Sequence, residues 1–269
     1  MSPPRMQPQD GVAWVTGASS GIGAAVAIEL ARRGWTVAAT ARRLDRLEAL
    51  AVSSAQLEGR IVAHCGDVAD PKAMAAVVDS IEGLHGPIAL AFLNAGIAPR
   101  NGPGMIDVAA FEQVFAVNLI GVARSAAAVA DRMSERGRGQ IAVNASLAGY
   151  RGLPGAAAYG ASKAAAIHLC EALQFDCARH GIRLQLVNPG FVDTQMTQRN
   201  SFPMPFMLSH EQAAQRIVDG FARGGFEIAF PRRLAWPMKL LRLLPYPIYA
   251  WAMRKLAGER RGGRRDGAV

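Results

Sequence analysis

Short apolar runs rich in β-branched residues alternate with segments of helical periodicity along most of this 269-residue chain. The apolar runs occupy residues 12–16, 35–40, 60–65, 88–96, 140–146, 182–190 and 226–230. The clearest helical segments between them span residues 21–34, 107–136 and 157–179. Strands alternating with helices form βαβ units, whose right-handed crossovers build a parallel sheet covered on both faces. The pattern predicts an α/β fold with a doubly wound, mostly parallel, seven-stranded sheet.

The alternation runs through residues 10–231 without an internal linker, which predicts a single domain over that range. We expect residues 1–9 to form a disordered polar tail. Residues 232–269 form a helical, apolar and basic C-terminal extension. With 51% hydrophobic and 19% charged residues, the chain can bury a sizeable core, which excludes extended disorder.

The formal net charge of +9 is concentrated at one end of the chain. Residues 232–269 hold ten Lys and Arg against two acids, so the preceding 231 residues are close to neutral. A neutral body argues against nucleic acid as a partner. Three irregularly spaced cysteines argue against a disulfide framework and favour a reducing, cytoplasmic location. We expect no metal site, because the His and Cys residues of 168–180 do not form a complete ligand set on their helix.

The segment TGASSGIG (16–23) lies between the first predicted strand and the first predicted helix. Its glycines permit a tight turn and close approach to a ligand. The free amides and positive dipole at the start of the following helix suit a pyrophosphate. The spacing G-xxx-G-x-G differs from the G-x-G-xx-G fingerprint of other dinucleotide sites. The predicted phosphate-binding residues are Gly17, Ser19, Ser20, Gly21, Ile22 and Gly23.

The end of the second strand indicates which cofactor is bound. NAD sites place an acid there to hold the ribose hydroxyls, whereas an arginine suits the 2′-phosphate of NADP. The sequence AATARRLD has no acid at the strand end, and Arg42 and Arg43 follow at once. Since guanidinium groups pair well with phosphate, we expect NADP(H) as the cofactor.

Tyr159 and Lys163, in the sequence YGASK, lie four residues apart on a predicted helix and share one face. A free tyrosine has a pKa near ~10, and a neighbouring ammonium favours the phenolate. We therefore expect Lys163 to lower the pKa of Tyr159 and make it a usable acid. Ser146 ends the fifth strand, at the sheet edge where α/β folds bind ligands. Its hydroxyl can hydrogen-bond a substrate carbonyl.

TGASSGIG, GDV (66–68), NAG (94–96), Asn118, Ser146, YGASK and NPG (188–190) occur in an order and spacing that resembles the short-chain dehydrogenase/reductase family over about residues 10–230. The resemblance implies a Rossmann-type, NADP-binding catalytic domain. It implies that Asn118 completes a catalytic set with Ser146, Tyr159 and Lys163, and links Lys163 through water to solvent. It implies that Tyr159 and Lys163 also contact the cofactor. The other cofactor residues it implies are Asp67, Val68, Asn94, Ala95, Gly96, Pro189, Gly190, Val192 and Thr194.

The segment QMTQRNSFPMPFML (195–208) follows Thr194, and in the family this segment closes over the substrate. Its Met and Phe side chains suggest an apolar, adaptable substrate pocket. We expect substrate contacts from Met196, Phe202 and Phe206, in addition to Ser146 and Tyr159. Packing of these side chains on the protein's own core is the alternative.

These features predict an NADP(H)-dependent oxidoreductase of CH–OH groups that acts on an apolar aldehyde, ketone, lipid-like or steroid-like molecule. Within enzymes, the alternative is a 3-oxoacyl-thioester reductase of fatty-acid type. From another class, the alternative is a non-catalytic NADP-sensing or scaffold protein. The family resemblance also implies a homodimer or homotetramer built on the helices near 107–136 and 157–179.

The extension mixes Leu, Trp and Tyr with Lys and Arg, and prolines interrupt it at 237, 245 and 247. Two interpretations are open for it. Residues 232–265 either lie on an anionic membrane surface as a peripheral contact, or form a short helix packed on the body or on a second subunit. Lys239 and Arg242 interrupt the apolar run and argue against a membrane span.

Overall fold

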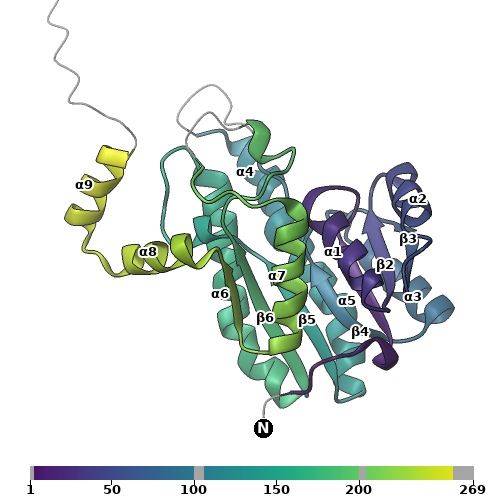
Figure 1. Ribbon diagram of the computed structural model, residues 1–269. Coiled ribbons are helices and arrows are strands. Elements are labelled where there is room, and N and C mark those ends of the chain that lie inside the picture. The colour runs from purple at the N-terminus through teal and green to yellow at the C-terminus, as the bar shows by residue number, and fades with distance from the viewer. Residues whose placement is uncertain (1–2, 100–105, 200–203, 257–269) are drawn as a thin grey trace, which may run out of the picture.

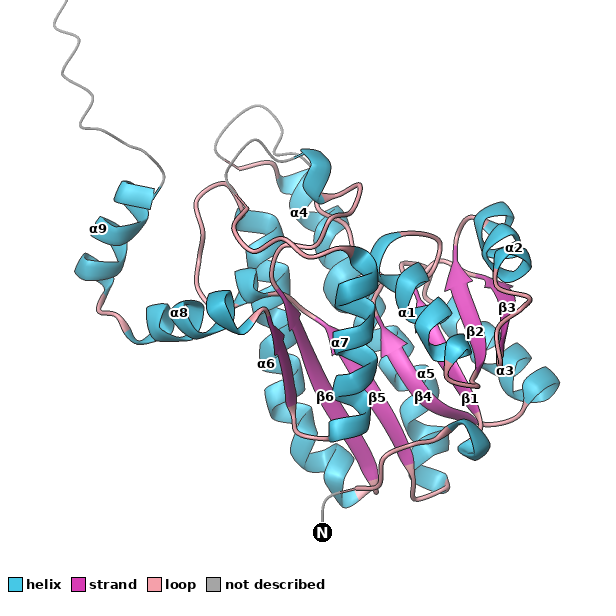
Figure 2. Cartoon of the chain, viewed as in Figure 1, coloured by secondary structure: helices cyan, strands magenta, loops and turns pink. Residues whose placement is uncertain are grey.

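A single parallel sheet forms the centre of the protein (Figures 1 and 2). The computed structural model describes residues 3–99, 106–199 and 204–256. The strand order is β3-β2-β1-β4-β5-β6-β7, and every pairing is parallel. The strands are β1 (Val12–Thr16), β2 (Thr36–Ala41), β3 (Arg60–Cys65), β4 (Ile88–Leu93), β5 (Gly139–Asn144), β6 (Ile182–Pro189) and β7 (Glu227–Phe230). The predicted seven-stranded, doubly wound Rossmann-type sheet is confirmed.

Helices cover both faces of this sheet. The helices of the body are α1 (Gly21–Arg32), α2 (Leu44–Ser53), α3 (Ala73–His85), α4 (Val108–Phe115), α5 (Gly121–Glu135), α6 (Ala157–Arg179) and α7 (His210–Arg223). The extension adds α8 (Arg232–Leu243) and α9 (Tyr246–Leu256). Ser209 and Gln212 form a capping box at the start of α7.

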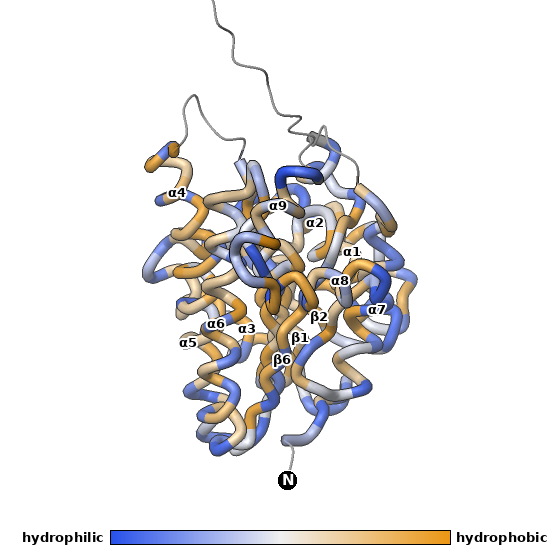
Figure 3. The backbone as a smooth tube through the Cα atoms, turned by 90° about the vertical axis from the view of Figure 1, so that its left-hand side faces the viewer, coloured by the Kyte–Doolittle hydropathy of each residue, from blue (hydrophilic) through white to orange (hydrophobic). Residues whose placement is uncertain are grey.

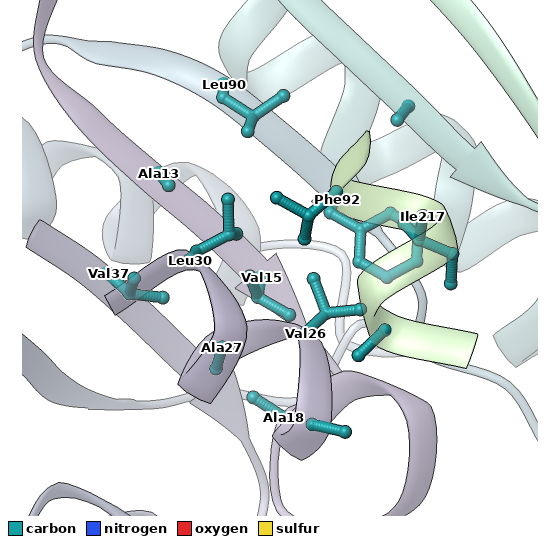
Figure 4. Packing of buried hydrophobic residues seen from close by; sticks show 14 of the residues in the cluster. Ala13, Val15, Ala18, Val26, Ala27, Leu30, Val37, Leu90, Phe92 and Ile217 are labelled. Atoms are coloured by element: carbon teal, nitrogen blue, oxygen red, sulfur yellow. The ribbon is translucent and has the colours of Figure 1, made fainter. Parts of the chain in front are cut away.

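Successive residues of each central strand enter different cores. In β1, Ala13 and Val15 pack on α1 and α7, as Figure 4 shows, whereas Val12 and Trp14 join a second cluster under α3, α5 and α6. All five residues of β1 are buried as a result. In Figure 3 the hydrophobic colour is accordingly concentrated in the strand layer, with hydrophilic segments around it. Burial on both faces is why these strands read as unbroken apolar runs.

The predicted helix over 107–136 is continuous but not uniform. Asp107 caps α4, and residues Ala116–Ile120 form a π-helical turn between α4 and α5. The run Val108–Glu135 is long and apolar enough to cross a membrane by length and composition alone. It is instead a layer helix of this fold, because it packs on β4, β5, α3 and α6.

The N-terminal segment corrects one expectation. Residues 3–9 are not a free tail, because Met6 is buried and its amide donates a 3.0 Å hydrogen bond to the side chain of Gln140. Arg5 and Arg183 each donate to backbone carbonyls across this contact. The segment lies at the amino edge of the sheet. Its polar sequence does not indicate that the side chain of Met6 is buried against the body.

Candidate active site

A cleft of about 580 Å³ opens at the carboxyl edge of the sheet. It runs from the β1–α1 loop and the end of β2, past β4 and β5, to the loop after β6. The predicted residues that line it are Gly17, Ser19, Ser20, Gly21, Ile22, Arg42, Arg43, Asp67, Val68, Asn94, Ala95, Gly96, Ser146, Tyr159, Lys163, Pro189, Gly190, Val192, Thr194 and Met196. The fold therefore gathers in one cleft residues separated by up to 179 positions in the sequence.

The β1–α1 loop requires its glycines. Gly17 has φ 69°, and a Cβ there would lie 2.7 Å from the Cα of Ala95. Gly23 does not line the cleft, in contrast to its predicted contact with the cofactor. A Cβ at Gly23 would lie 2.3 Å from the carbonyl oxygen of Gly17. Gly23 therefore lets α1 pack tightly behind the loop.

The start of α1 fits the pyrophosphate of a dinucleotide. Ser20 is the N-cap residue, and its side chain makes no capping hydrogen bond. The amides of the first turn are therefore without a side-chain cap at the cleft wall, where the helix dipole is positive. This arrangement suits an anion, in agreement with the predicted role of the loop.

The two arginines after β2 occupy different positions at the same end of the cleft. Arg43 donates a 2.9 Å hydrogen bond to the hydroxyl of Ser19. Arg42 is 70% exposed, with its guanidinium 3.9 Å from a carboxylate oxygen of Asp67. The two cations and the Ser19 hydroxyl border the position expected for the adenosine ribose. These groups can hold a phosphate there.

Asn94 and Val68 shape the middle of the cleft. The backbone amide of Asn94 donates a 2.9 Å hydrogen bond to the Thr16 hydroxyl, and its side-chain amide donates a 3.1 Å bond to the Thr16 backbone carbonyl. The side-chain oxygen of Asn94 accepts a 2.8 Å hydrogen bond from the side chain of Asn144. Asn94 therefore ties together the ends of β1, β4 and β5. Val68 is buried against Gly121, and a Cβ at position 121 would lie 2.7 Å from a methyl group of Val68.

Tyr159 and Ser146 form the reactive end of the cleft. Burial raises the pKa of the Tyr159 phenol, and a hydrogen bond with the Ser146 hydroxyl lowers it in part. Ser146 is itself buried, and its oxygen accepts a 3.1 Å hydrogen bond from the amide of Ala148. The net shift of the Tyr159 pKa is upward, opposite to the lowering predicted from Lys163, and burial is its largest cause.

Lys163 is only 3% exposed, and its ammonium donates a 2.7 Å hydrogen bond to the backbone carbonyl of Asn144. The ammonium lies 5.8 Å from the centre of the Tyr159 ring. Burial lowers the pKa of Lys163 to about 8. An ammonium has three donors, so this geometry leaves capacity to hold ribose hydroxyls in the cleft.

Asn118 lies behind the cleft, in the π-helical turn, and is fully buried. Its side chain accepts a 2.8 Å bond from the amide of Ile97 and donates 2.9 and 3.1 Å bonds to Ile97 and Ser162. A Cβ at Gly96 would lie 3.4 Å from the Asn118 oxygen and 3.5 Å from the Lys163 ammonium. The Asn118 oxygen and the Lys163 ammonium therefore both lie beside the position that a side chain at Gly96 would occupy.

The substrate end of the cleft includes Met196 but not Phe206. Phe206 is 50% exposed and does not line the cleft, and its backbone has φ 58°. Phe206 therefore lies outside the cleft, in contrast to the predicted substrate contact. Phe202 lies outside the described residues.

Sequence reasoning missed several residues of the site. Asn144, two positions before Ser146, supplies the carbonyl that holds Lys163. Its own side-chain oxygen is buried without a hydrogen-bond partner in the described structure. Residues from the β4–α4 region also line the cleft: Ile97, Ala98, Pro99, Gln113 and Val117. No local sequence pattern predicts that these residues belong to the site. The Asn144 carbonyl and the residues of the β4–α4 region reach the cleft only through the tertiary fold.

Comparison with known proteins agrees with this geometry. A family model for short chain dehydrogenases matches residues 11–203. An uncharacterized oxidoreductase of Myxococcus xanthus is 38% identical over 245 residues, which cover 91% of this chain and 96% of that protein. An acetoacetyl-CoA reductase of Synechocystis is 36% identical and covers 70% of this chain and 75% of its own length. A solved short-chain dehydrogenase from Sphingobium yanoikuyae, in complex with NADPH, has a TM-score of 0.75 at 28% identity, over 96% of this chain and 98% of that one.

The fold and the cleft define a nucleotide-binding oxidoreductase of the Rossmann type. The chain belongs to the short-chain dehydrogenase/reductase family.

Proposed function

We propose that this protein is an NADP(H)-dependent reductase of apolar aldehydes or ketones that also catalyses the reverse oxidation of the alcohol. The observation that carries the proposal is the arrangement of the cleft. The hydroxyls of Ser146 and Tyr159 and the ammonium of Lys163 lie at one end. Arg42 and Arg43 lie at the other end.

Each residue has a definite part in the reduction. A bound nicotinamide supplies the hydride. Ser146 holds the carbonyl oxygen by a hydrogen bond, which strengthens as negative charge develops on that oxygen. Tyr159, whose phenol pKa is raised by burial, donates its proton to the same oxygen. In oxidation, Tyr159 takes this proton back.

Lys163 supports both binding and proton transfer. The Asn144 carbonyl fixes the ammonium beside the Tyr159 ring, where its charge favours the phenolate left after proton donation. Its remaining donors suit the ribose hydroxyls of the cofactor. Asn118 holds the backbone of Ile97 in place next to Lys163, and so preserves the path toward solvent.

NADP(H) is favoured over NAD(H) by the residues after β2. Among the described residues at this end of the cleft, Asp67 is the acid, and Arg42 lies 3.9 Å from it. Arg43 and Ser19 are already joined by a hydrogen bond across the opening. Two guanidinium groups and a hydroxyl match the donors that a 2′-phosphate needs.

A 3-oxoacyl thioester is the second candidate substrate. The similarity to an acetoacetyl-CoA reductase supports it. The apolar residues that line the cleft beside Ser146 and Tyr159 favour the first candidate, since Ile97, Pro99, Val117 and Met196 offer no charge to a phosphorylated carrier.

The test is oxidation of NADPH by the purified protein with aldehydes, ketones, steroids and 3-oxoacyl thioesters, with NADH in parallel. We expect turnover of an apolar carbonyl class and a preference for NADPH. Turnover restricted to thioesters would transfer the proposal to the second candidate. Binding of NADPH without turnover of any compound would favour a sensor or scaffold protein.

A further inference from the structure

The C-terminal extension is fixed to the body by specific contacts. Lys239 of α8 forms an ion pair with Glu227 of β7, and Ala235 is buried under the sheet edge. The hydroxyl of Tyr249 donates to the carbonyl of Gly152, in the loop that leads to α6. Arg151 of the same loop lies 4.6 Å from the ring centres of both Tyr246 and Tyr249. The two helices therefore hold a defined orientation relative to the cleft.

The outward side of the extension is apolar. In α8, Trp236, Leu240 and Leu243 are 65%, 58% and 81% exposed, and their spacing places them on one face. In α9, Ile248 and Trp251 are 51% and 55% exposed. So many large apolar side chains on two adjacent helices form a patch that needs a partner.

The same segment carries one sign of charge. Residues 232–256 contain six Lys and Arg and no Asp or Glu. The exposed cations are Arg232 and Arg233 at the start of the segment, Arg242 at the end of α8, and Arg254 and Lys255 at the end of α9. Arg242 lies 3.9 Å from Glu171. The Lys255 ammonium lies 4.2 Å from the ring centre of Trp251, so aromatic and basic groups share one surface.

We propose that α8 and α9 dock on the surface of an anionic lipid bilayer. Aromatic and aliphatic side chains between basic residues match the interfacial region, where rings lie at headgroup level and cations meet lipid phosphates. Helices of 12 and 11 residues are too short to span the hydrocarbon layer. The segment therefore lies on the bilayer surface.

Charge complementarity distinguishes this partner from a second copy of the chain. A symmetric contact would bring the same patch of each copy together. Arg232, Arg233, Arg254 and Lys255 of each copy would then come together, and residues 232–256 contain no acid to neutralise them. An anionic bilayer supplies the missing negative charge.

Docking would also orient the cleft. Figure 1 shows α9 rising on the side of the sheet where the strands end, the side on which α4 begins. Ile106 and Val108 at the start of α4 are 69% and 63% exposed, and Phe206 and Met207 are 50% and 41% exposed. The extension therefore rises at the edge of the sheet where the cleft opens.

Vesicle flotation of the full chain tests the proposal. We expect the protein to float with vesicles of phosphatidylcholine and phosphatidylserine in equal amounts, and to stay behind with phosphatidylcholine alone. Trp236→Glu with Trp251→Glu should weaken binding more than about tenfold. Val52→Glu with Leu84→Glu is the matched control, because these residues are 77% and 71% exposed on α2 and α3.

A second pair of variants tests the charge. Arg254→Gln with Lys255→Gln should weaken binding to anionic vesicles roughly thirtyfold, at about a tenfold loss per 1.4 kcal/mol. Arg179→Gln with Arg223→Gln removes the same charge from exposed positions on α6 and α7, and should change binding by less than about twofold.

Two results would overturn the proposal. One is equal flotation of the tryptophan variant and its control, or no flotation of the unmodified protein. The other is a change from a larger to a smaller assembly in the tryptophan variant without vesicle binding, which would assign the surface to contacts between copies. Turnover of a water-soluble carbonyl without vesicles should be the same in all variants, so this outcome is independent of the proposed function.

Discussion

The Lys163 ammonium and the backbone carbonyl oxygen of Asn144 are joined by a 2.7 Å hydrogen bond in the interior of the protein. The carbonyl belongs to the last residue of β5, two residues before Ser146. One bond therefore fixes the cation on α6 relative to the strand that leads to Ser146, the residue proposed to hold the substrate carbonyl. Among the described residues no carboxylate pairs with this buried cation, and burial lowers its pKa to about 8.

Lys163→Met should stabilise the protein at pH 7. A pKa lowered from 10.5 to about 8 corresponds to a penalty of about 3 kcal/mol for burying the ammonium. The unpaired Asn144 carbonyl offsets part of this gain, so we expect a net stabilisation of about 1–2 kcal/mol. Denaturant unfolding without cofactor measures it, with exposed Lys72→Met as the control.

The gain from Lys163→Met should depend on pH in a defined direction. Below pH 8 the lysine is protonated in both states, and the penalty is constant. Between pH 8 and 10.5 the unfolded chain binds the proton more tightly, so the native protein gains stability as the pH rises. The difference between the variant and the native protein should therefore shrink in this window. A constant difference would show that the ammonium is not the cause.

Tyr159→Phe should retain cofactor binding and lose catalysis. The phenol is the proposed proton donor, and general acid catalysis contributes about 10²–10⁴-fold to the rate. We expect kcat to fall by at least this amount, with the Kd for NADPH changed less than about threefold. Stopped-flow turnover and fluorescence titration of NADPH measure the two effects. Residual turnover above a tenth of the native rate would refute the mechanism.

Arg42→Ala and Arg43→Ala should weaken NADPH binding selectively. A hydrogen bond between charged groups contributes about 1.5–3 kcal/mol, and solvent screening at these exposed positions reduces the effect to about tenfold for each. The affinity for NADH should hardly change. Arg46→Ala, on the exposed side of α2, controls for the general loss of charge. Equal losses for NADPH and NADH would contradict the proposed phosphate site.

Glu227→Gln should destabilise the contact between β7 and α8. Burial would raise the pKa of Glu227, but hydrogen bonds from Lys239, Tyr150 and Asn188 outweigh it and lower the pKa. Removing the charge should cost about 1–3 kcal/mol. Glu171→Gln, 3.9 Å from Arg242 and 41% exposed, should cost less than about 0.5 kcal/mol. Thermal unfolding of both variants makes the comparison.

The effect of Glu227→Gln should disappear in acid. A carboxylate whose pKa is lowered by folding stabilises the protein above its unfolded pKa, and this stabilisation is lost as the pH falls through the folded pKa. The native protein and the variant should therefore converge in stability below the ordinary range of a glutamate. If the variant stays less stable than the native protein at low pH, its loss of stability comes from packing and not from the carboxylate charge.

The sequence by itself determined the features that depend on local spacing. Alternating strands and helices predicted the parallel sheet, because burial on both faces makes each strand an apolar run. The glycines of residues 16–23 and the spacing of Tyr159 and Lys163 on one helix face predicted the loop and the reactive pair. These patterns are readable because backbone geometry fixes which neighbours share a face.

The tertiary structure alone decided features that depend on distant neighbours. Burial sets the pKa of Tyr159 and Lys163, and the burying atoms come from elements far apart in the chain. Phe206 lies outside the cleft despite the predicted substrate contact, and the buried Met6 holds in place a segment that the sequence predicts to be a tail. The docking of α8 left its tryptophan and leucines facing outward. Desolvation and packing arise from the whole fold, so no local pattern of residues encodes them.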